Sequence, residues 1–150
     1  MVQIYVDADA CPVKDETVRV AARHNLKTWM VCDGGIRPSP DPMVELIIVT
    51  QGADAADDWI AEHISSADVC VTNDIPLAAR CLEKAAKAIK PNGDVFTESM
   101  IGMALANREL MQGLRETGQI TGGPAAFSKS DRSNFLNRFE TLVQAAIREA

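Results

Sequence analysis

The sequence predicts an α/β fold, a three-layer α/β/α sandwich in which helices cover both faces of a mainly parallel sheet. Short runs rich in β-branched and aromatic residues alternate with segments whose apolar residues recur at the helical period of about 3.6 residues. Such alternation is typical of β-α-β units with right-handed crossovers. The 150 residues contain no repeat or linker, and their apolar and charged fractions, 47% and 24%, are ordinary for a globular protein. We therefore expect one domain over residues 1–150.

Two strands and one helix are expected at the start of the chain. Residues 3–7 and 27–32 are apolar-rich runs with β-branched and aromatic content, which is typical of strands. Between them, Pro12 suits a first helical turn, and apolar residues keep a helical spacing as far as His24. This segment is therefore predicted to be the crossover helix between two parallel strands.

A loop, two more strands and a second helix follow. Residues 33–42 hold two glycines and three prolines, too many for a helix or a strand. Residues 44–50 are predicted to form the third strand and residues 69–72 the fourth. Between these strands, in segment 51–64, acidic residues precede the apolar ones, which the helix macrodipole favours at a helix start.

The rest of the chain is predicted to be mainly helical. Apolar residues at helical spacing predict a helix over 75–89, which the turn residues 91–93 end before a short strand at 95–96. Thr97 can cap the next helix through its side-chain oxygen. The last helix starts near Ser130 and carries one wide apolar stripe, so it is expected to pack on the core.

Charge and composition limit the location and the partners. The net charge is −6, and residues 1–75 carry 13 acidic and 5 basic side chains, whereas residues 76–150 carry 8 and 10. This asymmetry indicates either a solvated acidic face or a cation site beside a mildly basic flank. The sequence has no apolar run of membrane-spanning length and no signal-peptide pattern at its start, so we expect a cytoplasmic protein without a membrane partner. The four cysteines form no Cys-x-x-Cys pair and are expected to be buried and reduced.

Acidic residues gather where the predicted strands end. In open parallel sheets, ligands bind outside the carboxyl ends of the strands. Six aspartates follow three of the predicted strands at these positions: Asp7, Asp9, Asp54, Asp57, Asp58 and Asp74. Carboxylates brought together this way repel one another unless a cation neutralises them, and hard oxygen ligands favour Mg²⁺ or Mn²⁺. The six aspartates are therefore candidate metal ligands.

Each aspartate also has a structural interpretation when it is taken alone. Asp54 or Asp57 could cap a helix, Asp9 could stand in a turn, and Asp74 could begin the next helix. The coincidence at three strand ends favours the metal site over this set of unrelated roles.

The chain resembles the uncharacterised bacterial YaiI/YqxD family over nearly its whole length. The likeness is carried by DADACPVK, QGADAADDWIA, VTNDIPLAARCLEKAAKAI, FTESMIGMALANREL and GGPAAFSKSDRSNFLNRF. That family is similar to PIN-like domains, a superfamily in which acids at strand ends bind metal ions and cleave phosphodiesters in RNA or DNA. The resemblance therefore implies a single PIN-like domain that acts as a nuclease with Mg²⁺ or Mn²⁺.

The resemblance also implies roles for individual acids. Asp7 matches the first-strand acid of PIN-like nucleases, and Asp74 matches the acid at the end of a later strand. Asp57 or Asp58 matches the acid that opens a helix before an apolar pair, with Asp54 as an alternative to Asp57. In a nuclease with the catalytic residues Asp7, Asp58 and Asp74, bound metal would lower the pKa of a water and screen the phosphate.

One customary position of the PIN-like pattern has no counterpart in this chain. No glutamate lies clearly on an inserted second helix, and Asp9 is the candidate to replace it. This departure leaves open an alternative, a PIN-like module that binds nucleic acid or a protein without cleaving it.

Basic residues in two regions are candidates for binding substrate phosphates. They are Lys14, Lys129, Arg132 and Arg138. The last three lie around Phe127 and Phe135 in the region of the Gly-Gly-Pro segment, and Arg132 is the first choice among them. The alternative is that this region is an ordinary solvated helix start whose phenylalanines belong to the core.

A second enzyme class shares the opening motif. The segment DADAC after a strand resembles the start of haloacid-dehalogenase phosphatases, in which the first aspartate attacks phosphorus and the second is the acid. Here Cys11 stands where that motif has a hydroxyl-bearing or β-branched residue, and no lysine motif is evident. The phosphatase is therefore the more distant alternative.

Overall fold

The computed structural model describes residues 1–9, 11–50, 52, 54–116 and 126–150. These residues form a five-stranded sheet in which every strand is parallel to its neighbours. The strands are β1 (Gln3–Asp7), β2 (Lys27–Cys32), β3 (Val44–Ile48), β4 (Val69–Val71) and β5 (Lys87–Ile89). Their order across the sheet is β3-β2-β1-β4-β5.

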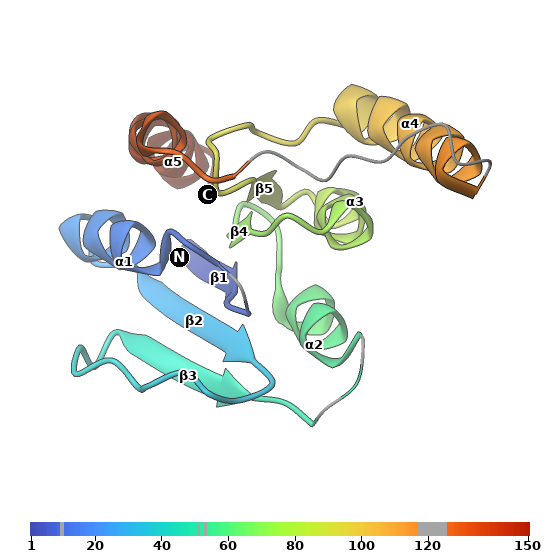
Figure 1. The fold of residues 1–150 in the computed structure, drawn as a ribbon. Helices are drawn as coiled ribbons and strands as arrows, with labels where there is room; N and C mark the ends of the chain where they lie inside the picture. The colour runs from blue at the N-terminus through green and yellow to red at the C-terminus, as the bar shows by residue number, and fades with distance from the viewer. Residues whose placement is uncertain (10, 51, 53, 117–125) are drawn as a thin grey trace.

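Helices cover both faces of this sheet (Figure 1). They are α1 (Lys14–Arg23), α2 (Ala55–His63), α3 (Ile75–Glu83), α4 (Glu98–Glu116) and α5 (Lys129–Glu149). Helices α1 and α5 share a core with one face, α2 and α3 share a core with the other, and α4 begins beside α3 and extends away from the sheet. The predicted three-layer sandwich with a parallel sheet is therefore confirmed.

The alternation of side chains along β1 shows how one strand serves both cores. Ile4 and Val6 pack toward α1 and α5, whereas Tyr5 packs toward α2 and α3, because successive side chains of a strand point to opposite faces. The α5 side is closed by Phe135 and Phe139, whose rings stack with centroids 4.9 Å apart.

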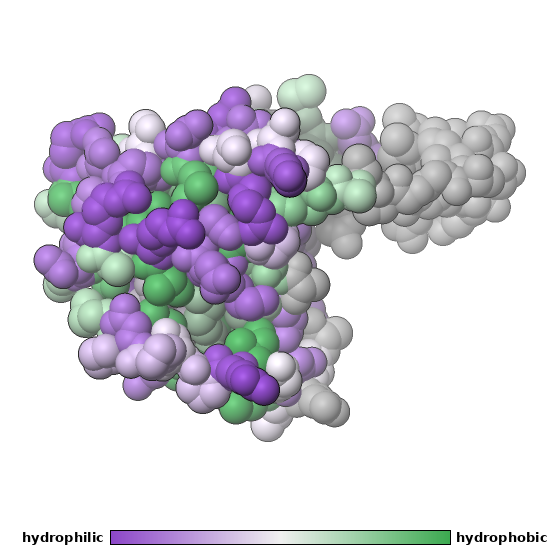
Figure 2. All heavy atoms as spheres, turned by 60° about the vertical axis from the view of Figure 1, so that its left-hand side comes forward, coloured by the Kyte–Doolittle hydropathy of each residue, from purple (hydrophilic) through white to green (hydrophobic). Residues whose placement is uncertain are grey.

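On the side of the molecule seen in Figure 2, hydrophilic side chains cover most of the surface, with hydrophobic atoms showing between them.

The strand order places a crevice beside β1. After β1 the chain builds β2 and β3 on one side, and it then returns to build β4 and β5 on the other side. The crossover helices consequently lie on opposite faces of the sheet, so a crevice opens at the carboxyl ends of β1 and β4. Such reversal points are where open α/β sheets bind ligands.

One stretch of the sequence prediction was wrong. The helix expected over 75–89 ends at Glu83, and residues 87–89 form β5 at the edge of the sheet. Ala85 has a positive φ of 62°, which no helix tolerates in its interior. Alanines and lysines favour a helix locally, but the hydrogen bonds of β5 with β4 override that preference. The strand expected at 95–96 is reduced to an antiparallel bridge between Val95 and Ile89.

The connection from β2 to β3 is unusual, because these two parallel strands are joined without a helix. Residues 33–43 cross the α1 side of the sheet as an irregular segment, as their glycines and prolines predicted. Ile36 of this segment packs against the α1 core. A loop thus lies where a crossover helix would normally cover the sheet.

The prediction of buried cysteines without disulfides is confirmed. Cys11, Cys32, Cys70 and Cys81 are all buried and free of disulfides. Among the residues described, no helix has the length and apolar character needed to cross a membrane.

Candidate active site at the carboxyl ends of the strands

Five carboxylates share one cavity in the crevice beside β1. The cavity has a volume of about 480 Å³. The described residues that line it are Asp7, Asp9, Asp33, Gly52, Ala56, Asp57 and Asp74. None of these lining residues is basic, so the cavity collects negative charge from the ends of β1, β2 and β4 and from the start of α2.

Asp7 is fixed at the end of β1 by a hydroxyl from the neighbouring strand. Its side chain is on the same face as Tyr5, two residues earlier, and so on the side of α2. The Thr72 hydroxyl, directly after β4, donates to Oδ2 of Asp7 at 2.9 Å. The same Thr72 oxygen accepts the backbone N–H of Asp74, also at 2.9 Å. One buried threonine therefore ties the ends of β1 and β4 together.

Asp74 has two roles at once. Its Oδ1 accepts the backbone N–H of Leu77 at 2.7 Å and so caps the start of α3. This is the structural role that its position before a helix predicted. The carboxylate nevertheless borders the acidic cavity, which Asp57 also lines. Capping fixes its orientation and does not remove it from the site.

The structure separates Asp57 from its neighbour Asp58. Successive residues of a helix are rotated by about 100°, so only one of the two can face the crevice. Asp57 lines the cavity, whereas Asp58 points to solvent and pairs with Arg80 at 2.7 Å. Asp54 stands just before α2, is exposed, and makes no side-chain capping bond. Of the three acids in this segment, Asp57 is the one placed among the cavity carboxylates.

Asp9 and Asp33 complete the rim of the cavity. The backbone N–H of Asp33 donates to Oδ2 of Asp9 at 3.1 Å, which joins the chain after β1 to the chain after β2. Asp9 is therefore close to the crevice, as predicted. Asp33 was not among the predicted site residues, although it follows the strand predicted at 27–32. The strand-end rule that selected the other acids would have selected it too.

Burial and mutual repulsion dominate the electrostatics of this cavity. Burial, followed by the charges of Asp74, Asp7 and Asp54, raises the pKa of Asp57 to about 7. Burial also raises the pKa of Asp7; the Thr72 hydroxyl opposes this rise, and the charges of Asp74 and Asp9 add to it. The described residues that line the cavity include no cation, and Arg80, whose charge acts on Asp57, is paired with Asp58 outside the cavity.

The donor set fits a hard divalent cation. Carboxylate oxygens are the ligands that Mg²⁺ and Mn²⁺ prefer, and the cavity offers them from four separate segments. Across the described ranges, no three His, Cys, Asp or Glu side chains are already grouped closely enough to hold an ion. Binding would therefore require small movements of these carboxylates toward a common ion.

The four residues predicted to bind phosphate lie in different parts of the structure and have different contacts. Lys14 begins α1, and its Nζ donates to the Cys11 carbonyl at 2.9 Å. Lys129 is the exposed first residue of α5. Arg138 pairs with Asp94 at 3.4 Å. None of these side chains lines the acidic cavity.

Arg132 joins α5 to α1. Its Nη1 lies 2.5 Å and 2.9 Å from the two carboxylate oxygens of Glu16, which is only 6% exposed, and 2.9 Å from the Pro12 carbonyl oxygen. Its guanidinium also lies over the Phe127 ring. These contacts give Arg132 a structural role, because removing it would leave a carboxylate buried without its partner.

We expect Arg132→Met to destabilise the protein by about 2 kcal/mol, less than a fully buried pair would lose because the guanidinium is partly exposed. Urea unfolding measures this loss. The variant Glu16→Gln/Arg132→Met should recover part of it, because the unpaired buried charge is then gone. If Arg132→Met is as stable as the wild type, the ion pair does not hold α5 to α1.

The acidic cavity does not activate the cysteine beside it. Cys11 is buried, and burial is the largest cause that raises the pKa of its thiol. A nucleophilic cysteine requires the opposite shift. Cys11 therefore packs in the core as a small apolar residue.

The comparisons with known proteins cover nearly the whole chain. Residues 5–145 match the family described as "Uncharacterized BCR, YaiI/YqxD family". A UPF0178 protein of Parvibaculum lavamentivorans is 57% identical over 145 residues, which span 97% of this chain and 95% of the relative. UPF0178 proteins of Rhodopseudomonas palustris and Paramagnetospirillum magneticum are 54% and 53% identical over 148 residues, or 99% of this chain and 94% and 98% of theirs. No solved structure matches the chain. The chain therefore belongs to the YaiI/YqxD family, as its sequence motifs predicted.

Proposed function

We propose that this protein is a nuclease of PIN-like type that hydrolyses phosphodiesters of RNA or DNA with Mg²⁺ or Mn²⁺. One observation carries the proposal. Asp7, Asp57 and Asp74 come from three distant segments and line one cavity at the point where the strand order reverses. Capping and turn formation explain single acids, but they do not explain why the acids gather in one cavity.

The carboxylates of Asp7, Asp57 and Asp74 form a negatively charged site, in which two of the three side chains are held in place by hydrogen bonds. Thr72 holds Asp7, and the helix start of α3 holds Asp74, so two of the three carboxylates have fixed orientations. Asp57, in the first turn of α2, lines the same cavity. A divalent cation, when bound, would neutralise this cluster, attract the phosphate and lower the pKa of the attacking water. The carboxylate oxygens of Asp7, Asp57 and Asp74 would hold the cation and position the attacking water.

The nuclease is tested by comparing the wild type with Asp7→Asn/Asp74→Asn. Asparagine keeps an oxygen for the Thr72 hydroxyl and for the cap of α3, so the double variant should fold, which circular dichroism checks. We expect calorimetry to show Mn²⁺ binding to the wild type only. With single- and double-stranded RNA and DNA as substrates, the double variant should cleave at least about a hundredfold more slowly.

The alternatives give different results in the same experiment. A binding module would retain nucleic acid without cleaving it in any metal. A phosphatase of the haloacid-dehalogenase type would form a phosphoaspartate at Asp7 with a small phosphate ester, which mass spectrometry detects. Absence of both Mn²⁺ binding and cleavage in the folded wild type would overturn the nuclease proposal.

A further inference from the structure

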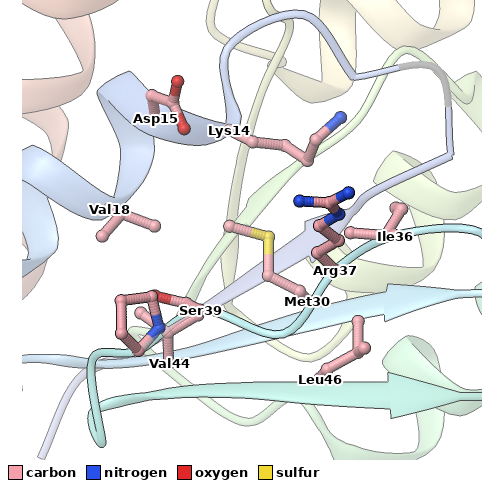
Figure 3. Close-up of a pocket in the computed structure, with 10 residues that line it drawn as sticks. Lys14, Asp15, Val18, Met30, Ile36, Arg37, Ser39, Val44 and Leu46 are labelled. Atoms are coloured by element: carbon pink, nitrogen blue, oxygen red, sulfur yellow. The ribbon is translucent and has the colours of Figure 1, made fainter.

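A second cavity lies on the other side of the sheet, between α1, the strands β2 and β3, and the crossover segment 33–42. Its volume is about 290 Å³. Figure 3 shows Val18 on α1, Met30 on β2, Leu46 on β3 and Ile36 on the crossover around it. These side chains give the cavity an apolar floor and walls.

The cavity exists because β2 and β3 are joined without a helix. The irregular crossover covers the α1 side of these strands less completely than a packed helix would. The side chains of Met30 and Leu46, which are paired in register on neighbouring strands, therefore border open space. A methionine and branched aliphatic side chains form a surface on which a flat ring can pack.

Two cations, Lys14 and Arg37, line the same cavity together with one carboxylate, that of Asp15. Lys14 at the start of α1 and Arg37 on the crossover extend toward the same end of it, which is the end where β2 and β3 finish (Figure 3). Residues 1–75 carry only 5 basic side chains against 13 acidic ones. Two of these five basic side chains, Lys14 and Arg37, line this one cavity. Within the described part of the chain, no carboxylate lies within 4.0 Å of the Arg37 guanidinium. Arg37 is thus available to an anion.

The two cavities are neighbours along the chain. Asp33 lines the acidic cavity, and the crossover that begins at Asp33 lines the apolar one with Ile36 and Arg37. Lys14 similarly follows Asp7, the last residue of β1, and Asp9 along the chain. A ligand that reaches the acids at the strand ends can therefore extend over this edge of the sheet into the apolar cavity.

We infer that this cavity receives the base of an unpaired nucleotide, with Lys14 and Arg37 binding the phosphate next to it. The inference rests on the proposed nuclease function and names its substrate class, which is single-stranded nucleic acid. The apolar floor can pack against the face of a base, and the two cations can bind the phosphate next to that base. The volume is at the lower end of the range of about 300 to 1,000 Å³ for ligand sites, which suits one small ring system. A base stacked in a duplex cannot enter such a cavity unless it is extruded.

The charge component is tested with Arg37→Glu and its matched control Arg19→Glu. Arg19 is also exposed and in the same acidic half of the chain, but it does not line the cavity. Both changes are made in the cleavage-silent Asp7→Asn/Asp74→Asn protein, without metal, and fluorescence anisotropy measures binding of an RNA or DNA single strand of about ten nucleotides. We expect Arg37→Glu to weaken binding at least about tenfold and Arg19→Glu to weaken it about twofold or less.

The base component is tested with Val18→Phe, which fills the cavity without changing charge, and with Val18→Ala as its control. Val18→Phe should weaken binding of the single strand at least about tenfold, because the base loses its site. An abasic strand of the same length and charge should bind Val18→Phe and Val18→Ala equally. Equal loss for the normal and abasic strands would overturn base insertion.

Failure of this inference can be distinguished from failure of the nuclease proposal. If the wild type cleaves with Mn²⁺ while Arg37→Glu and Val18→Phe, made in the wild type, cleave single strands with unchanged KM, the cavity inference is overturned and the nuclease stands. If the wild type cleaves only duplexes, the single-stranded substrate class is overturned. If Mn²⁺ binds but no nucleic acid is bound or cleaved, both proposals are overturned.

Discussion

The Asp57→Asn variant is expected to be more stable than the wild type without metal and to lose most of the stabilisation that Mn²⁺ gives the wild type. Asp57 is placed among carboxylates in a cavity whose described lining residues include no cation. Removing one charge relieves repulsion, and because solvent screens part of it we expect a gain of about 1 kcal/mol, or roughly 2 to 4 °C in Tm. Mn²⁺ at about a hundred times its Kd would stabilise the wild type by about 2.7 kcal/mol. Thermal unfolding with and without Mn²⁺ measures both effects.

The pH dependence gives this variant an internal control. Asp57 has its pKa raised to about 7 in the folded protein, above its ordinary value. The folded protein holds the proton of Asp57 more tightly than the unfolded chain does, so the penalty is absent below the ordinary pKa of 3.8, grows as the pH rises above it and is complete above about 7. The stability advantage of Asp57→Asn should therefore be larger at pH 8 than at pH 5.

Asp58→Asn is the matched comparison, since it makes the same change one residue further along α2. Asp58 is exposed and pairs with Arg80 outside the cavity. We expect the Mn²⁺ stabilisation of this variant to equal that of the wild type, with a change in stability of less than about 1 kcal/mol from the surface ion pair. If Mn²⁺ stabilises Asp57→Asn fully and Asp58→Asn not at all, Asp58 is the metal ligand, as first predicted, and the cavity assignment is wrong.

This contrast also shows where sequence reasoning reaches its limit. The rule that ligands gather at the carboxyl ends of parallel strands selected Asp7 and Asp74, and the structure brings both to the crevice. The choice between Asp57 and Asp58 depends on a rotation of about 100° around α2. The periodicity of a helix of nine residues does not fix that rotation, because its first turn precedes the apolar positions. Packing against β1 and α3 fixes it.

Tertiary contacts also determine two other features that the sequence pattern does not predict, the strand β5 and the apolar cavity. Residues 87–89 have the composition of a helix, and they become β5 because β4 offers them a partner edge. The apolar cavity depends on how the 33–42 crossover lies over Met30 and Leu46, and a loop prediction contains no such placement. The three-layer fold itself was predictable, since it follows from the alternation of strands and helices over the whole chain.

Gly93→Ala is expected to produce the largest loss of stability, about 3 kcal/mol, equivalent to roughly 10 °C in Tm. Gly93 has a φ of +97° in the turn after β5, which an L side chain adopts only under strain. A Cβ there would lie 2.8 Å from the carbonyl carbon and 2.9 Å from the carbonyl oxygen of Asn134 in α5. Both neighbours are backbone, so the clash cannot be relieved by rotating a side chain.

Gly102→Ala is the control for this substitution, because it makes the same chemical change inside α4, where the new Cβ meets no described atom within 4 Å apart from the backbone of its own helix. Alanine favours a helix over glycine, so this variant should match or exceed the wild-type stability by up to about 1 kcal/mol. Opposite signs for the two variants would show that α5 is seated directly on the β5 turn and that Gly93 is required for that contact. A Gly93→Ala protein that unfolds within about 1 °C of the wild type would mean that α5 has room to move outward. The closure of the α1 and α5 core by Phe135, which follows Asn134, would then be less tight than the structure shows.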